Sequence, residues 1–222
     1  MSTDIQRTPT EIDQIAERWV DTLVELSPTV GTYIGRNEVN GRFGDYSPAG
    51  HEAMSTAARG VIAELDAQSP SDAVDDVTKT DLRATLELQL RSHDAQLHLR
   101  DLNVIASPAQ EIREIFDLMP TATVADWEQI SSRLEAVPAA IDGYIETLRA
   151  GIAAGVTPAV RQVREVAAQT NRLWADNGFF TEFTAGASLE SGELPASLAR
   201  KLAGGRRCLR RRLPQAERVP HP

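Results

Sequence analysis

The sequence predicts an all-α protein, built as a multi-helix array or bundle. Apolar residues recur at three- and four-residue spacing along most of the chain, whereas alternating stretches of strand length are scarce. Ser-Pro and Thr-Pro pairs separate these stretches. Such pairs are typical of helix starts, because proline fits the first helical position and the preceding hydroxyl can cap the helix. With 222 residues, 41% hydrophobic and 25% charged, the composition is globular.

The first helix is expected to begin at Thr8 and to run to about Ser27. Thr8-Pro9-Thr10-Glu11 combines a capping hydroxyl, a proline at the first helical position and a glutamate three residues after the cap. Apolar residues then follow at helical spacing, so one face should be buried and Trp19 with it. That face consists of Ile12, Ile15, Ala16, Trp19, Leu23 and Leu26.

The next helices are expected after Ser27-Pro28, after Ser47-Pro48 and after about Asp76, with loops over 35–46 and 67–76. The helix after Asp76 should be the longest. Its buried face is expected to hold Leu82, Leu86, Leu90, His93 and Leu97.

In the second half, Ser107 and Gln110 predict a capping box at the start of a helix that Pro120 ends. Two separate helices are expected next, one marked by Trp127, Ile130 and Leu134 and one by Ile141 to Ile152. Later helices should follow Thr157-Pro158, with Val160, Val163, Val166 and Leu173 on one face, and Pro195, with Leu198 and Leu202.

The charge is distributed unevenly. The whole chain carries −9, but eight basic residues and one acidic residue follow position 199, so that part carries +7 and the first 199 residues −16. Such an acidic body disfavours a nucleic-acid partner, since phosphate binding needs clustered Lys and Arg. The sequence also has no long apolar run, no cationic leader and only one cysteine, Cys208. We therefore expect a cytoplasmic protein that binds no membrane.

A zinc site of the His-Glu-x-x-His type is only half present. Two histidines four residues apart lie on one helix face and can share a metal ion. Here His51-Glu52 is followed by Ala53, Met54 and Ser55, so the second histidine is missing. We do not expect His51 to be a metal ligand.

The other histidine pair, His93 and His98, is five residues apart. On a continuous helix this spacing separates the side chains by about 140° around the axis. The pair is therefore expected not to converge, with His93 on the buried face donating to a partner and His98 in solvent.

Other candidate sites are also weak. Cys208 lies in an Arg-rich stretch without an evident base, and Asp75-Asp76 is expected to be a solvated pair in a loop. Gly204-Gly205 lacks the Lys-Ser/Thr ending of a phosphate loop. The sequence therefore predicts no catalytic, cofactor-binding or metal-binding residue and no cofactor in this chain.

Three segments carry a family resemblance: ELSPTVGTYIG at 25–35, ASPAQEIREIFDLMP at 106–120 and RLEAVPAAIDGY at 133–144. In this order they resemble the bacterial domain-of-unknown-function family 885, over about residues 10–200. Most of the residues involved look structural, because Pro28 and Pro108 can start helices and Gly35 can end one.

The resemblance implies a link to helical zinc metallopeptidases more than twice as long as this chain. Their zinc motif, His-Glu followed by Pro-Gly-His, lies in the C-terminal half and has no match here, so no catalytic residue carries over. What the resemblance implies is the N-terminal helical portion of an incomplete domain, which in the complete protein would pack over the zinc-bearing half and help to form a peptide cleft.

We expect residues 1–203 to form this helical region and residues 204–222 to be a basic, disordered tail. Arg and Pro enrichment is what a GC-rich gene yields when it is read out of frame. The stretch from Gly205 to Pro222 is therefore hypothesised to be a frameshift product, which the gene sequence can test. The alternative is a basic segment that binds acidic surfaces, including the protein's own body.

Two classes of function follow from these expectations. In the leading interpretation the chain is a catalytically inactive helical fragment of a metallopeptidase-like protein, not an enzyme as it stands. In the alternative it is a helical binding module that uses an exposed apolar face. If the fragment interpretation holds, self-association through exposed apolar helix faces is expected.

Overall fold

The structure is a computed structural model that describes residues 7–173, 175, 177–189 and 192–212, with only the backbone described for 206–212. Helices make up all the regular elements of these residues, which confirms the all-α prediction. The α-helices are α1 (Glu11–Leu26), α2 (Pro28–Tyr33), α3 (Pro48–Asp66), α4 (Ala73–Asp94), α5 (Pro108–Glu114), α6 (Val124–Ala154), α7 (Val160–Leu173), α8 (Phe179–Ala185) and α9 (Ala196–Arg212). Short 3₁₀ helices are η1 (Asn37–Val39), η2 (Leu97–Arg100) and η3 (Ile115–Leu118).

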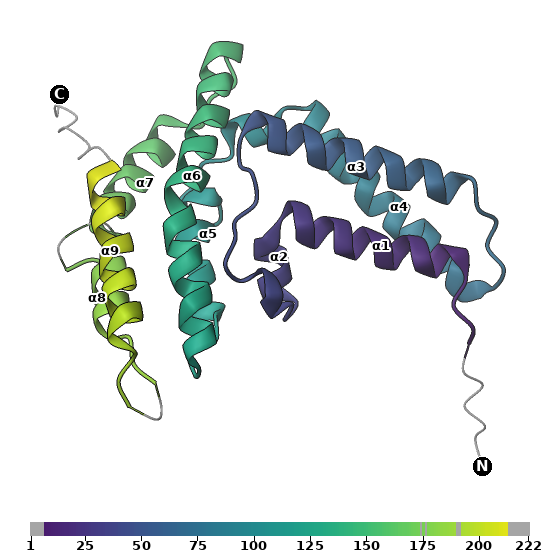
Figure 1. The fold of residues 1–222 in the computed structure, drawn as a ribbon. Helices are drawn as coiled ribbons and strands as arrows, with labels where there is room; N and C mark the ends of the chain where they lie inside the picture. The colour runs from purple at the N-terminus through teal and green to yellow at the C-terminus, as the bar shows by residue number, and fades with distance from the viewer. Residues whose placement is uncertain (1–6, 174, 176, 190–191, 213–222) are drawn as a thin grey trace.

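The helices form two groups (Figure 1). Helices α1, α3 and α4 pack side by side in one group, and α6 packs against α9 and α5 in the other. The segment between α2 and α3 runs between the groups. No helix in the described part of the chain is long and apolar enough to cross a membrane.

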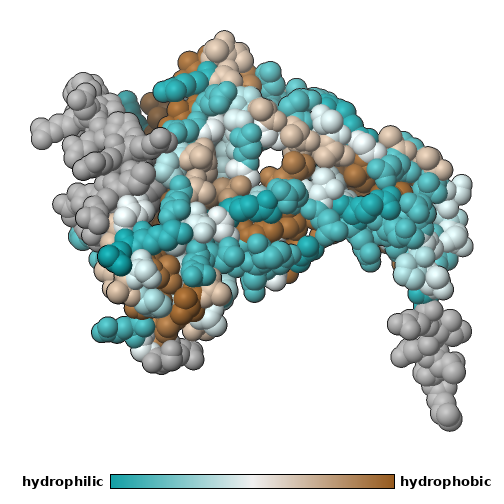
Figure 2. All heavy atoms as spheres, viewed as in Figure 1, coloured by the Kyte–Doolittle hydropathy of each residue, from teal (hydrophilic) through white to brown (hydrophobic). Residues whose placement is uncertain are grey.

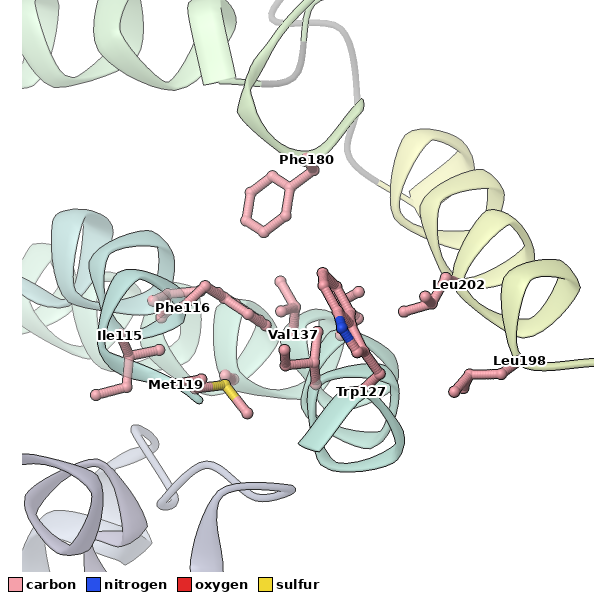
Figure 3. Packing of buried hydrophobic residues seen from close by; sticks show 12 residues of the cluster. Ile115, Phe116, Met119, Trp127, Val137, Phe180, Leu198 and Leu202 are labelled. Atoms are coloured by element: carbon pink, nitrogen blue, oxygen red, sulfur yellow. The ribbon is translucent and has the colours of Figure 1, made fainter. Parts of the chain in front are cut away.

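Each group has its own hydrophobic core. The first core lies among α1, α3 and α4 and contains Ile12, Ile15, Trp19, Ala58, Val61, Leu65 and Leu86. The second is larger and is centred on α6 (Figure 3). There, Phe180 of α8 and Leu198 and Leu202 of α9 point toward Trp127 and Val137 of α6. The expectation that Trp19 is buried is confirmed, since 7% of its surface is exposed.

The caps were predicted with mixed success. Ser107 and Gln110 form the expected capping box, and Ser47 caps α3 by accepting from the Gly50 amide. The start of α1 was placed too early, because its N-cap is Thr10, not Thr8. Thr10 and Asp13 form a reciprocal box there.

The expected break between two helices in the 127–152 region was wrong. A single helix, α6, spans all 31 residues with Pro138 inside it, and it is therefore longer than the 22-residue α4. Proline removes one backbone hydrogen bond. The helix continues because Leu134, Val137 and Ala140, on either side of the missing bond, are all buried in one core.

The last helix also runs further than expected. α9 begins after Pro195 as predicted, but its backbone stays helical to Arg212, past the boundary placed after Ala203. The remaining tail, residues 213–222 and with it His221, lies outside the described residues.

The interpretation of Asp75-Asp76 as two solvated charges in a loop was wrong, because both residues lie in α4 and Asp75 is buried, although Asp76 is exposed. α4 begins at Ala73, and the Asp75 side chain in its first turn is 1% exposed. Its carboxylate accepts from the Ser71 hydroxyl at 2.6 Å and the Thr10 hydroxyl at 2.7 Å, and it pairs with Arg7. These bonds lower the pKa of Asp75 to about 2, with the Ser71 hydroxyl the largest cause. Asp75 thus ties the start of α1 to the start of α4.

We expect Asp75→Asn to lower the urea midpoint at neutral pH and to flatten its fall in acid. Folding lowers the Asp75 pKa from 3.8 to about 2, so its contribution is present above 3.8 and is lost as the pH falls through about 2. Urea unfolding across this range measures the slope. Asp76→Asn, at an exposed neighbour, is the control and should keep the wild-type slope; equal slopes for all three proteins would contradict the role of Asp75.

Candidate functional site

Three histidines from three elements meet at the end of the first helical group. His51 lies in α3, His93 near the end of α4 and His98 in η2. The His98 ring contacts both of the others: its centroid is 4.8 Å from that of His93, with the planes 7° apart, and 4.6 Å from that of His51, with the planes 34° apart. The expectation that His93 and His98 do not converge was therefore wrong.

A left-handed residue explains the error. The 140° separation holds only on a continuous helix, but α4 ends at Asp94 and Gln96 adopts φ 56°, ψ 31°. The Gln96 amide donates to the His93 carbonyl at 2.8 Å, which closes a tight turn. After this turn the chain forms the 3₁₀ helix η2, in which the His98 ring stacks on the His93 ring. A non-glycine residue with positive φ gives no clear signal in a single sequence.

The environment of the cluster opposes charge on two of the rings. Burial is the largest cause that lowers the pKa of His51 to about 4, followed by the His98 and His93 rings, while Asp45 acts the other way. Burial and then His93 also lower the pKa of His98. His98 is half-buried, not solvated as expected.

Hydrogen bonding within the cluster is incomplete. The Nδ1 atoms of His93 and His98 are buried and make no hydrogen bond to any described residue. His93 Nε2 lies 3.6 Å from the Glu52 carboxylate and His93 Nδ1 lies 3.8 Å from that of Asp94. Arg59 lies 3.4 Å from both carboxylates. His93 thus faces acidic groups, but the expected donation to a hydrogen-bonding partner is not present.

The donor atoms do not form a coordination site. Among the described residues, no group of three or more His, Cys, Asp and Glu side chains is placed to hold a metal ion. The parallel rings of His93 and His98 direct their nitrogen atoms along separate planes, whereas a tetrahedral ion needs them turned toward one point.

An open groove borders the cluster and shares Glu52 with it. The groove lies between α1 and α3 and has a volume of about 810 Å³. Its floor is apolar, and its acidic rim residues each pair with an arginine: Asp21 with Arg36, Glu25 with Arg42 and Glu52 with Arg59. Figure 2 shows hydrophobic surface between these helices, bordered by hydrophilic side chains. The apolar lining comes from Leu26, Ala49, Ala53 and Ala57.

A second exposed apolar area lies where α2 packs against η3. Tyr33 is 56% exposed, Ile34 54% and Leu118 50%. The pKa of Tyr33 is raised by burial and then by the charges of Glu111 and Glu114, which places both carboxylates nearby. We call Tyr33, Ile34 and Leu118 the α2–η3 patch. Sequence reasoning missed it because Tyr33 and Leu118 are far apart in the chain.

The other sequence candidates form no site in the described part of the chain. Gly204 and Gly205 lie within α9, so they are not a phosphate loop. Cys208 lies on the same helix, but its side chain is outside the described residues.

The comparison with protein families agrees with the motifs quoted above. The model of the family described as bacterial protein of unknown function (DUF885) matches residues 28–214. No curated protein matches the chain. The match runs past Gly205, where the tail was expected to leave the family pattern, and the frameshift hypothesis stays a prediction for the gene sequence to test. Because the match covers most of the 222 residues, the chain belongs to the DUF885 family of bacterial proteins.

Proposed function

We propose that this chain is a non-catalytic helical module of a peptide-hydrolase-like protein. In this proposal it is the N-terminal portion, which covers a zinc-bearing half and forms one wall of a peptide cleft. Support comes from the family match, which extends from α2 to α9, and from the motifs that resemble metallopeptidase-like members.

The observation that carries the proposal is the α2–η3 patch. Three large apolar side chains, each at least half exposed, belong to two segments, the end of α2 and η3, that pack against one another. Large exposed apolar areas on globular domains mark contact surfaces, because each Å² left in water forgoes about 25 cal/mol. Glu111 and Glu114 beside Tyr33 give the surface an acidic edge. A covering domain would bury the patch, and without one the chain should self-associate there.

A second candidate function is an independent binding module. The groove between α1 and α3 favours it, since its apolar floor could accept a helix or an extended peptide. In this case the partner would occupy the groove and leave the α2–η3 patch exposed.

A hydrolysis assay tests the absence of catalysis. The purified chain, dialysed against zinc and analysed for metal by mass spectrometry, is incubated with a mixed peptide library. We expect no stoichiometric zinc and no cleavage above a heat-denatured control. Cleavage with bound zinc that disappears in His51→Ala would overturn the proposal.

Self-association distinguishes the two surfaces. We expect the sedimentation coefficient of the wild type to rise with concentration, and the combined variant Tyr33→Ser, Leu118→Ser to reduce this rise. Val77→Ser is the matched control, because Val77 is 67% exposed but lies on α4. If Ala53→Glu in the groove abolishes association and the patch variant does not, the groove is the contact surface and the binding-module alternative is favoured.

A further inference from the structure

The three-histidine cluster lies where the two helical groups meet. His51 and His93 belong to α3 and α4, and His98 belongs to η2, which packs on α6. This packing is close: a Cβ at Gly151 of α6 would lie 2.3 Å from the Leu99 carbonyl oxygen. The Tyr144 hydroxyl, also from α6, donates to the Asp101 carbonyl at 2.6 Å. Any change in the histidine contacts therefore acts on the connection between the groups.

We propose that this cluster is an acid-sensitive joint: its neutral rings hold η2 against α3 and α4, and protonation separates the rings and loosens η2 from α6.

Ring stacking gives the first reason. Two imidazolium ions at centroid distances of 4.6 to 4.8 Å repel one another, and half-burial weakens the screening by water. The second reason is an unbonded nitrogen atom. An imidazolium donates from both nitrogens, yet the buried Nδ1 atom of His98 has no acceptor among the described residues. A protonated ring can find a hydrogen-bond acceptor or water for its buried nitrogen only by leaving the stack.

The charged groups around the cluster come from each element that packs there. Asp45 lies in the segment before α3, Glu52 and Arg59 belong to α3, and Asp94 ends α4. Arg59 lies 3.4 Å from both Glu52 and Asp94 and pairs with these two carboxylates. On the α6 side, the titratable group Tyr144 donates its hydroxyl to the carbonyl of Asp101, just after η2.

The sign of the pH dependence follows from the pKa shifts. Folding lowers the pKa of His51 from 6.5 to about 4 and also lowers that of His98. As the pH falls, the unfolded chain therefore takes up these protons before the folded chain does. The contribution of the neutral histidines to stability is complete above pH 6.5 and is lost as the pH drops toward about 4. Asp101, just after η2, acts in the opposite direction, because burial and Glu111 raise its pKa. A comparison between proteins that all contain Asp101 cancels its effect.

The test compares thermal unfolding of the wild type and His98→Phe at about pH 7.5 and about pH 5, a range in which histidine titrates. Phenylalanine keeps a ring in the stack but cannot be protonated. We expect the wild-type midpoint to fall by about 5 °C more than that of His98→Phe. His221→Gln, which removes the histidine outside the described residues, should keep the wild-type acid sensitivity.

Hydrogen exchange of the wild type provides a local readout that needs no variant. After correction for intrinsic rates, exchange at residues 97–102 should rise at least about threefold relative to α1 between the same two pH values. Equal acid sensitivity of the wild type and His98→Phe, or unchanged relative exchange at residues 97–102, would overturn the proposal.

Discussion

Replacing Arg133 with alanine should lower the free energy of unfolding by about 3–5 kcal/mol. Arg133 projects from α6, is completely buried and has no carboxylate partner at bonding distance among the described residues. Its guanidinium donates to the Arg42 carbonyl and the Thr32 hydroxyl at 3.0 Å, and to the Val39 carbonyl at 3.3 Å. These bonds fix the segment between α2 and α3 onto α6. Truncation would leave acceptors unsatisfied and open a cavity in the same place.

Arg133 stabilises the fold through its hydrogen bonds, whereas burial of its charge opposes folding. Burial is the main cause that lowers the Arg133 pKa to about 10, so the guanidinium stays charged at neutral pH at a cost in desolvation. The face of the Phe43 ring lies 5.4 Å from the guanidinium carbon and recovers part of that cost. One nitrogen, Nη1, still makes no hydrogen bond.

Two further variants separate hydrogen bonding from packing. Arg133→Met keeps most of the stem volume and removes every donor, so it should lose less stability than alanine but remain well below the wild type. Arg149→Met, at an exposed position of the same helix, is the control and should change the unfolding free energy by less than about 0.5 kcal/mol. Denaturant unfolding measures all three. A loss below about 1 kcal/mol for Arg133→Ala would show that other donors serve these carbonyls.

Local signals in the sequence predicted local structure. The capping box of Ser107 and Gln110 requires only four neighbouring residues, and the apolar face of α1 requires only spacing. Both expectations were confirmed. Pro138 shows where such reasoning fails, since a helix breaker inside a buried face is overruled by tertiary packing that spacing does not reveal.

The bonds of Arg133 and the histidine cluster depend on features that residue spacing does not reveal. Arg133 reaches acceptors about a hundred residues away, and a sequence does not indicate which carbonyl needs a donor. The histidine cluster depends on one left-handed residue, Gln96, which turns the chain between α4 and η2. The residue types were noticed, but the turn that brings them together was not predictable from spacing.

Trp19→Ala is the second change for which we expect a large effect, a loss of about 3–5 kcal/mol of unfolding free energy. Trp19 is 7% exposed and is the largest side chain in the core of α1, α3 and α4. That core is small, so its helices have few other apolar contacts with which to fill the cavity that alanine leaves. The second core, around α6, contains no residue of α1 and cannot compensate.

The neighbouring residue supplies the control for this prediction. Val20 is 40% exposed, so Val20→Ala should cost less than about 1 kcal/mol. Urea unfolding measures the free energy of unfolding of both variants. The two positions differ by about 100° around the α1 axis, and their contrast therefore tests the register of the helix directly. If both variants lose less than about 1 kcal/mol, Trp19 lies on the surface and the face with Ile12 and Ile15 is not the buried one. If Trp19→Ala alone is severe, the core of the first group depends on that one indole ring.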